Sequence, residues 1–311
     1  MNHQKFSSYN FIRQSGSTSF LVLLGCLIAG FFIAQFGSVV AVALFNGFDI
    51  NAVFSILSPP FTDESTRVPL LLAQGANSFI LFIATPFFYL HFYEQVNPKG
   101  VITAGNTPNS KLLLITIVLV IVYMPISAYT AFWNESIEIP GAFGELAQKM
   151  EEQLKELTLF MVNFSSFGQF LLGLIIIAVI PGIGEELLFR GVIQNKILKS
   201  FGNVHLAIWI TAFLFSAFHF QFYGFIPRML LGGLFGYLYI WSGSIIVPML
   251  AHFVNNGFTL LMMYLNKSGA SEIEIDSPDS YSLLGAVVSI ILVSGIIWYF
   301  RQINNKNISE I

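Results

Sequence analysis

A short segment near the middle of the chain, residues 181–191, has the sequence PGIGEELLFRG. It places the adjacent carboxylates of Glu185 and Glu186, and the guanidinium of Arg190, in a long apolar run. An ionisable side chain at the centre of a membrane helix costs roughly 2.5 to 3.5 kcal/mol on insertion scales, so such residues are candidates for function. A carboxylate is a group that can exchange protons with a reacting molecule.

Helical spacing separates the two carboxylates. Glu186 and Arg190 are four residues apart with the acid on the amino-terminal side, so in a helix they can form an ion pair. Glu185 points about 100° away from Glu186. We therefore predict that Glu186 and Arg190 form a structural pair and that Glu185 faces other groups.

Further polar side chains lie in apolar runs at a similar depth. Glu185 lies 17 residues before Gly202, where two predicted helices turn, and His219 lies 17 residues after it. His252 and Asn256 are four residues apart and share one face of a later helix. Each residue alone could be a packing or interhelical hydrogen-bonding group. Together we expect Glu185, His219, His252 and Asn256 to form one polar cluster inside the bilayer, open toward the cytoplasmic side.

The elements that must position this cluster are long apolar helices. Of the 311 residues, 55% are hydrophobic and 10% are charged. The apolar residues gather into runs near or beyond the ~18 to 20 residues needed to cross a bilayer. We predict an all-α polytopic membrane protein, surrounded by membrane lipids and with no nucleic-acid partner. Its eight predicted transmembrane helices lie near residues 19–46, 68–93, 111–133, 166–200, 204–220, 225–241, 245–265 and 282–300.

Basic residues predict the orientation of the chain. Most of them fall in segments on one side, including Arg13, Lys111, Lys199 and Arg301, and this bias favours cytoplasmic amino and carboxyl termini. The polar tail of about 18 residues precedes an apolar run too long for a signal-peptide core, so we expect a retained first span. The single cysteine, Cys26, allows no intrachain disulfide. The chain is predicted to form one integral membrane domain over residues 1–311.

Two segments leave alternatives open. Residues 142–164 carry apolar side chains at helical spacing with acids and lysines between them, which is typical of an amphipathic helix on the outer surface. This segment could instead extend the fourth span outward. The run from Ser166 to Ser200 would measure some 50 Å as a helix, longer than the hydrocarbon is thick. It should therefore project into the cytoplasm or bend at Pro181 and Gly182.

Three ordered motifs resemble those of a known family. The chain carries EELLFR at 185–190, FSAFH at 215–219 and HFVNN at 252–256. These match the EExxxR, FxxxH and HxxxN signatures of the CAAX protease and bacteriocin-processing (Abi) family, which includes the type II CAAX prenyl endopeptidases. Phe215 and Asn255 belong to the motifs, and we place them with Glu186 and Arg190 among the supporting residues.

This resemblance implies a glutamate-dependent intramembrane endopeptidase with its catalytic helical core at residues 166–265. Its substrate would be a peptide or protein, in some family members lipidated at the carboxyl terminus, and no cofactor is expected. Glu185 corresponds to the carboxylate that activates water, and His219 to its partner. His252 and Asn256 correspond to residues that orient water or hold the oxyanion.

Two other functions remain open at this point. Glu185, His219 and His252 also form a plausible two-histidine, one-carboxylate zinc shell, although the chain has no HExxH segment. A transporter or a non-catalytic immunity or scaffold protein could also use a polar cluster in the membrane. The inverted repeats typical of many transporters are not evident in the sequence. Arg228, at the predicted start of the sixth helix, is explained by snorkelling toward the surface.

Overall fold

The computed structural model of the protein describes residues 12–13, 16–103, 107–269 and 282–309, and in these ranges every regular element is helical. Six helices there are long and apolar enough to cross a membrane, which confirms the prediction of an all-α polytopic membrane protein. These are Ser17–Phe45, Glu64–Tyr93, Ser110–Glu135, Phe167–Phe201, Ile246–Lys267 and Leu283–Ile303.

The predicted count of eight spans is not confirmed. The runs at 204–220 and 225–241 form helices α11 (Val204–Ala217) and α12 (Phe225–Ser242), and neither is among the six. Helix α11 has 14 residues, so at ~1.5 Å per residue it is about 21 Å long and shorter than the ~30 Å hydrocarbon core. The two helices form a hairpin within the bundle.

Several spans consist of α-helical pieces joined by π-helical turns. The elements of the first half are α1 (Ser17–Phe45), α2 (Ile50–Leu57), η2 (Glu64–Thr66), α3 (Arg67–Phe79), η3 (Ile80–Ala84), α4 (Thr85–Phe88), η4 (Tyr89–Tyr93), α5 (Pro98–Thr103) and α6 (Ser110–Glu135). Those of the second half are α7 (Gly141–Val162), α8 (Phe167–Gly173), η5 (Leu174–Val179), α9 (Ile180–Glu186), η6 (Leu187–Gln194), α10 (Asn195–Phe201), α11, α12, α13 (Ile246–Lys267) and α14 (Leu283–Ser309).

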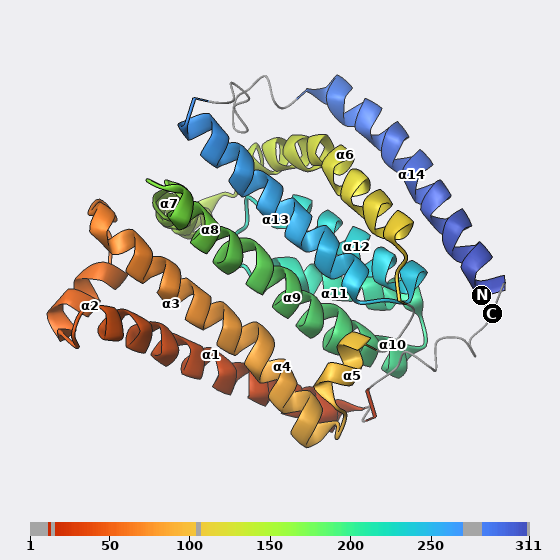
Figure 1. The fold of residues 1–311 in the computed structure, drawn as a ribbon, viewed down its shortest axis with the longest axis horizontal. Helices are drawn as coiled ribbons and strands as arrows, with labels where there is room; N and C mark the ends of the chain where they lie inside the picture. The colour runs from red at the N-terminus through yellow and green to blue at the C-terminus, as the bar shows by residue number, and fades with distance from the viewer. Residues whose placement is uncertain (1–11, 14–15, 104–106, 270–281, 310–311) are drawn as a thin grey trace.

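The long helix from α8 to α10 runs through the middle of the molecule. Figure 1 shows α1 and α3 side by side along one edge and α6 and α14 along the opposite edge, and both pairs are in contact. Between them, α9 packs against α13 and α3, and η6 packs against α11 and α12. The segment that carries Glu185 is therefore enclosed by other helices.

Small residues of the PGIG segment allow this enclosure. A Cβ atom on Gly182 would lie 3.1 Å from the backbone nitrogen of Phe253 on α13. A Cβ atom on Gly184 would lie 2.8 Å from the Cβ atom of Phe82 in η3. Since both distances are shorter than ordinary contacts, only glycine lets α9 approach these two neighbours closely.

Helix α7 is separate from the fourth span. Residues 163–166 break the helix, and the Ser166 hydroxyl accepts a hydrogen bond from the Gln169 amide at 3.2 Å, which caps α8. In Figure 1 α7 is seen nearly end-on, so it runs across the direction of the bundle. Its exposed side chains include Phe143, Leu146 and Leu159. The structure thus favours a separate amphipathic helix over an outward extension of the span.

The first helix begins and the last helix ends at the same end of the bundle. Lys196 of α10 contacts Ser19 in the first turn of α1 and pairs with Glu94 at 3.0 Å. Arg301 of α14 lies 5.5 Å from the ring of Trp241, at the end of α12. This arrangement agrees with two termini on one side of the membrane, while the side itself stays a prediction.

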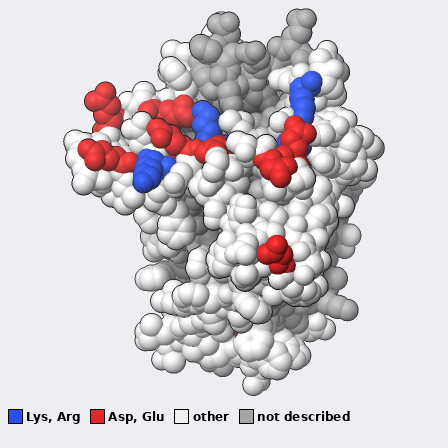
Figure 2. Space-filling view, turned by 90° about the vertical axis from the view of Figure 1, so that its left-hand side faces the viewer, with Lys and Arg blue, Asp and Glu red and all other residues white. Residues whose placement is uncertain are grey.

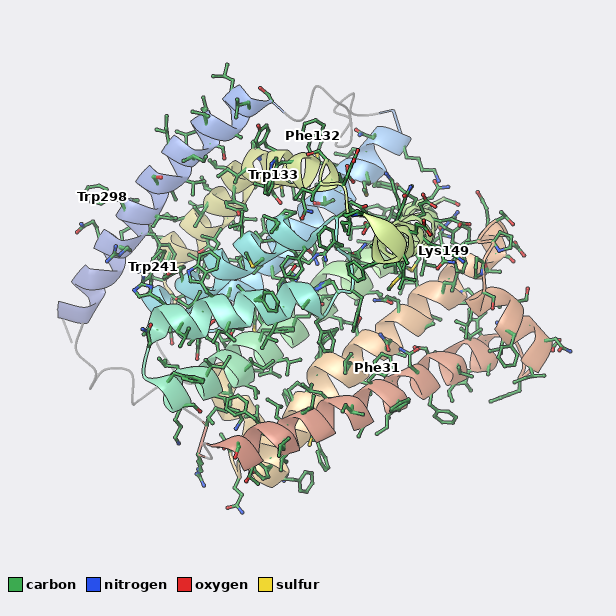
Figure 3. All side chains as sticks on the ribbon, turned by 180° about the vertical axis from the view of Figure 1, so that it is seen from behind. Phe31, Phe132, Trp133, Lys149, Trp241 and Trp298 are labelled. Carbon is green, nitrogen blue, oxygen red and sulfur yellow. The ribbon has the colours of Figure 1, made fainter. Side chains whose placement is uncertain are left out.

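The surface of the molecule has an apolar belt and, at one end, a charged region. Figure 2 shows the face at the left of Figure 1, where charged side chains, mostly acidic, gather in the upper part of the view. Figure 3 shows the Trp298 side chain on the outer side of α14, and this residue is 65% exposed. Exposed aromatic and aliphatic side chains on spanning helices are the surface that lipid chains cover.

Candidate functional site

Two π-helical turns bracket the acidic pair of the central helix. The turn η5 ends just before Ile180 and Pro181, and the turn η6 begins directly after Glu186. The whole stretch Phe167–Phe201 is helical over 35 residues. A π-turn shifts the register of the side chains that follow it, and such turns are frequent at functional sites. The change of register falls at the proline and glycine where a bend was expected.

Glu186 and Arg190 form the predicted ion pair. Arg190 Nη1 donates to Glu186 Oε1 at 2.7 Å, and both side chains are fully buried. Arg190 Nη2 also donates to the Gly232 carbonyl oxygen at 2.6 Å, and the guanidinium lies 5.0 Å from the Phe215 ring. The pair therefore joins α9 and η6 to α11 and α12. Removing one partner of such a buried pair typically costs ~3 to 5 kcal/mol, because it leaves an uncompensated charge.

Glu186 has a second partner that helical spacing did not predict. His252 Nδ1 lies 2.9 Å from the same oxygen, Glu186 Oε1, and the imidazole is 6% exposed. A carboxylate that also accepts from Arg190 is an acceptor, so Nδ1 of His252 carries a proton and donates it. This contact fixes the ring orientation and turns Nε2 toward the other side.

His219 lies in a turn and not in a helix. Helix α11 ends at Ala217, and residues 218–220 form the turn that follows. His219 Nδ1 lies 2.8 Å from the Phe215 carbonyl oxygen, which can only accept a hydrogen bond. In a neutral ring the proton is therefore on Nδ1, and Nε2 is an acceptor.

Both imidazoles turn Nε2 toward Glu185. Glu185 Oε2 is 3.9 Å from Nε2 of His219 and 3.9 Å from Nε2 of His252. The Glu185 side chain is 9% exposed, that of His219 30% and that of His252 6%. His219 is therefore the member of the cluster with the most exposed side chain. These distances exceed a direct hydrogen bond. The structure brings these three of the four expected residues together.

The asparagines of the third motif lie one turn farther along α13. Asn256 Nδ2 donates to the Ile177 carbonyl oxygen of η5 at 3.0 Å. Asn255 Nδ2 donates to Asn256 Oδ1 at 3.1 Å. Asn256 keeps one N–H for another acceptor, because a carboxamide has two. The side-chain hydrogen bonds of Asn256 are thus with η5 and Asn255 and not with the three clustered side chains.

The described residues contain no group of three or more His, Cys, Asp or Glu arranged to hold a metal ion. Two ligands of a tetrahedral zinc ion, bound at ~2.0 to 2.1 Å, lie ~3.3 Å apart. The two Glu185–histidine distances of 3.9 Å are longer. The three side chains as placed do not fit a zinc shell, and we derive no chemistry through a metal.

Sequence reasoning missed the role of Arg228, which it assigned to snorkelling. Arg228 Nη2 donates to Gln221 Oε1 at 2.9 Å, and Gln221 lies two residues after His219 in the same turn. No helical spacing reveals this link, because it depends on how the turn at residues 218–224 folds back on α12.

Comparison with known proteins supports the resemblance in this segment. Residues 167–258 match the family described as type II CAAX prenyl endopeptidase Rce1-like. All eight motif residues singled out above lie within this range. A protein of Bacillus subtilis (strain 168), the uncharacterized protein YpbD, is 33% identical over 85 residues. That alignment covers 26% of this chain and 40% of the relative, so it spans less than half of the relative's length. No solved structure matches the chain.

Proposed function

We propose that this protein is a membrane-embedded endopeptidase in which Glu185 activates a water molecule. One observation carries the proposal. Glu185 Oε2 is buried, has no hydrogen-bond partner within the described residues, and faces Nε2 of both His219 and His252 at 3.9 Å. The three side chains lie within the segment similar to the Rce1-like family.

The tautomers suggest how water would be held. A water molecule between Glu185 and His219 can donate one proton to Glu185 Oε2 and the other to His219 Nε2, since both atoms are acceptors. Its oxygen lone pair then remains free to attack a peptide carbonyl carbon. Glu185 takes a proton as the new C–O bond forms, and returns it to the amide nitrogen as the C–N bond breaks. The products are a carboxylic acid and an amine.

Donors for the oxyanion come from α13. Asn256 has one N–H left after its bond to Ile177, and its position near His252 makes it a candidate. His252 donates from Nε2 only when both ring nitrogens are protonated, and Glu186 then accepts from Nδ1. One such donor contributes ~2.7 to 4 kcal/mol to transition-state stabilisation in a site from which water is excluded.

The test is cleavage of defined peptides by detergent-purified protein. Lipidated and unlipidated carboxyl-terminal peptides are incubated with the wild type and with Glu185→Ala, and products are identified by mass spectrometry. We expect cleavage by the wild type and none by Glu185→Ala. Equal cleavage by the two proteins would remove Glu185 from the mechanism. Absence of cleavage of every peptide by a folded wild type would favour a transporter or a non-catalytic immunity or scaffold protein.

The proposed enzyme works without a cofactor, and the zinc alternative has its own test. Purified protein is analysed for bound metal, and cleavage is measured before and after treatment with a chelator. We expect no stoichiometric metal and the same rate after chelation. Loss of cleavage on chelation, restored by added zinc, would support the metalloprotease alternative.

A further inference from the structure

Three carboxamide side chains lie together on the exposed surface of two spans, apart from the motif residues. Gln35 is on α1, and Gln74 and Asn77 are on α3. Gln35 and Gln74 are exposed, and Asn77 is partly exposed. Asn77 lies 13 residues after the start and 16 before the end of the apolar helix Glu64–Tyr93, and Gln35 lies 18 residues after the start and 10 before the end of Ser17–Phe45. Both helices therefore place these polar groups deep in the bilayer.

Only part of their hydrogen-bonding capacity is used within the protein. Gln35 Nε2 donates to Asn77 Oδ1 at 3.3 Å, and Gln74 Nε2 donates to the Ser78 hydroxyl oxygen at 3.3 Å. Among the residues that the structure describes, no side-chain hydrogen bond engages Gln35 Oε1, Gln74 Oε1 or Asn77 Nδ2. Lipid chains offer no hydrogen-bonding group, so two open acceptors and one open amino group favour a polar ligand at this place.

Two of the carboxamides share the side of α3 that contacts α7. Leu70 packs in one cluster with Phe160 of α7, and Arg67 Nε donates to the Phe160 carbonyl oxygen at 3.0 Å. Gln74 and Asn77 follow Leu70 by four and seven residues, a spacing that keeps side chains on one side of a helix. They therefore lie next to the α7 contact, one to two turns farther along α3.

Farther along the same helix, α3 is followed by the turn η3, which contacts the proposed site. The Phe82 ring of η3 lies 5.8 Å from the ring of Phe218, in the turn after α11. A Cβ atom on Gly184, which precedes Glu185, would lie 2.8 Å from the Phe82 Cβ atom. Phe82 follows Gln74 by eight residues, or ~12 Å along the helix. An extended peptide of three or four residues covers this distance.

We infer that Gln35, Gln74 and Asn77 bind the main chain of an extended substrate peptide inside the membrane and guide it toward Glu185. The inference rests on the proposed function and adds a binding site to it. An extended main chain alternates N–H donors with C=O acceptors. These groups match the open carboxamide oxygens of the two glutamines and the open amino group of the asparagine. Recognition of this kind reads the main chain and tolerates different side chains.

A short extended peptide fits this place better than a helix from a second copy of the chain, although carboxamides can also join two membrane helices. The stretch of α3 between the α7 contact at Leu70 and the Phe218 contact at Phe82 spans 12 residues, or roughly 18 Å. That length suits about five extended residues. A longer helix lying along α3 would meet α7, which runs across the direction of the bundle (Figure 1).

The test removes single N–H groups from the peptide. Unlipidated peptides of the cleavage panel are made with one main-chain amide N-methylated at a time, and their binding to Glu185→Gln protein is titrated. We expect N-methylation at one position to weaken binding at least tenfold, and in a cleaved peptide this position is three or four residues from the cleaved bond. In Glu185→Gln/Gln74→Met the same N-methyl group should weaken binding no more than about twofold. Glu185→Gln/Gln153→Met is the matched control, because Gln153 is an exposed glutamine of α7, and it should keep the tenfold effect.

Thermal unfolding and oligomeric state separate this role from others. Gln74→Met should leave the thermal transition unchanged, since the side chain is exposed. An N-methyl effect of equal size with and without Gln74, or no binding of any panel peptide to Glu185→Gln, would overturn the inference even if the wild type cleaves. A dimer that Gln74→Met converts to monomers, with no change in the N-methyl effect, would overturn it in favour of a second copy. An N-methyl effect that depends on Gln74 supports the site even if Glu185→Ala cleaves as well as the wild type, an outcome that removes only the proposed mechanism.

Discussion

At the scale of single residues, the two adjacent glutamates have different tasks. Glu186 is fully buried and accepts from both Arg190 and His252, whereas Glu185 Oε2 has no hydrogen-bond partner in the described part of the chain. The i, i+4 spacing was sufficient to predict the Glu186–Arg190 pair. It could not predict the His252 contact, because that depends on how close α13 comes to α9. Glu186 is thus a positioning residue for His252 and an anchor for Arg190.

This division predicts effects of different size on stability for two alanine substitutions. Glu186→Ala leaves the buried Arg190 charge without its carboxylate, so we expect it to lower the free energy of unfolding by ~3 to 5 kcal/mol. Glu185→Ala removes no hydrogen bond of the described residues and should leave stability within about 1 kcal/mol of the wild type. Thermal unfolding of the purified proteins in one detergent provides the measurement. A larger loss for Glu185→Ala than for Glu186→Ala would contradict the assignment.

His219 should contribute to catalysis more than to stability. Its Nδ1 bonds only to a backbone carbonyl, and its ring is partly exposed. We expect His219→Ala to lower kcat by ~10² to 10⁴, the range typical of a positioned proton-exchanging group. The thermal transition should shift little. His205→Ala is the matched control, because His205 is an exposed histidine at the other end of α11, bonded to Tyr237. Similar losses of kcat in both variants would count against a role for His219.

At the scale of elements, the sequence predicted the turn between α10 and α11 but not the residue at which α11 ends. The turn at Gly202 is present, with Gly202 at φ 66° and Asn203 capping α11. Counting residues from this turn correctly paired Glu185 with His219. The expected helix at 204–220 was three residues too long, since α11 ends at Ala217. The π-turns around Glu185 leave no periodicity signal that apolar spacing would reveal.

The close approach of α9 and α13 can be tested through one glycine. Gly182→Leu introduces a side chain where even a Cβ atom would lie 3.1 Å from the Phe253 backbone. We expect a loss of ~1 to 3 kcal/mol in the free energy of unfolding, as for other overpacked interiors. Cleavage should fall at least tenfold, because α13 and His252 move away from Glu185. Peptide cleavage and thermal unfolding are measured together.

Gly25→Leu is the control for this substitution. Gly25 lies in α1, and a Cβ atom there meets nothing within 4 Å. The same change in volume should therefore leave stability and cleavage near the values of the wild type. Full activity of Gly182→Leu would show that the distance between α9 and α13 is not limiting.

At the scale of the whole molecule, two predictions from the sequence now conflict. The amphipathic segment was placed on the outer surface, and the polar cluster was expected to open toward the cytoplasm. In the structure the turn that carries His219 contacts α7 through the bond between Gln221 and Glu151. His219 is also the most exposed member of the cluster. The turn that carries His219 and α7 therefore lie together, and both belong to the same side of the membrane.

Single-cysteine labelling decides which side this is. Cys26 is first replaced by alanine, which leaves a chain without cysteine. One cysteine is then introduced at exposed Lys149 on α7, labelled in Figure 3, or at exposed Ser200 on α10. From the basic residues near α10 and the acidic face at α7, we expect a membrane-impermeant maleimide to label Lys149→Cys in intact cells and Ser200→Cys only after lysis.

This result would place the entrance for substrate on the outer side, because α7 and the His219 turn are joined. Labelling of Ser200→Cys alone in intact cells would show the reverse orientation of the chain. The entrance for substrate would then lie on the cytoplasmic side, toward which the cluster was first expected to open. Labelling of both positions in intact cells would contradict the separation of α7 and α10 to opposite ends. Under the proposed function the outcome also limits the substrate, since a peptide must reach His219 from the side on which α7 lies.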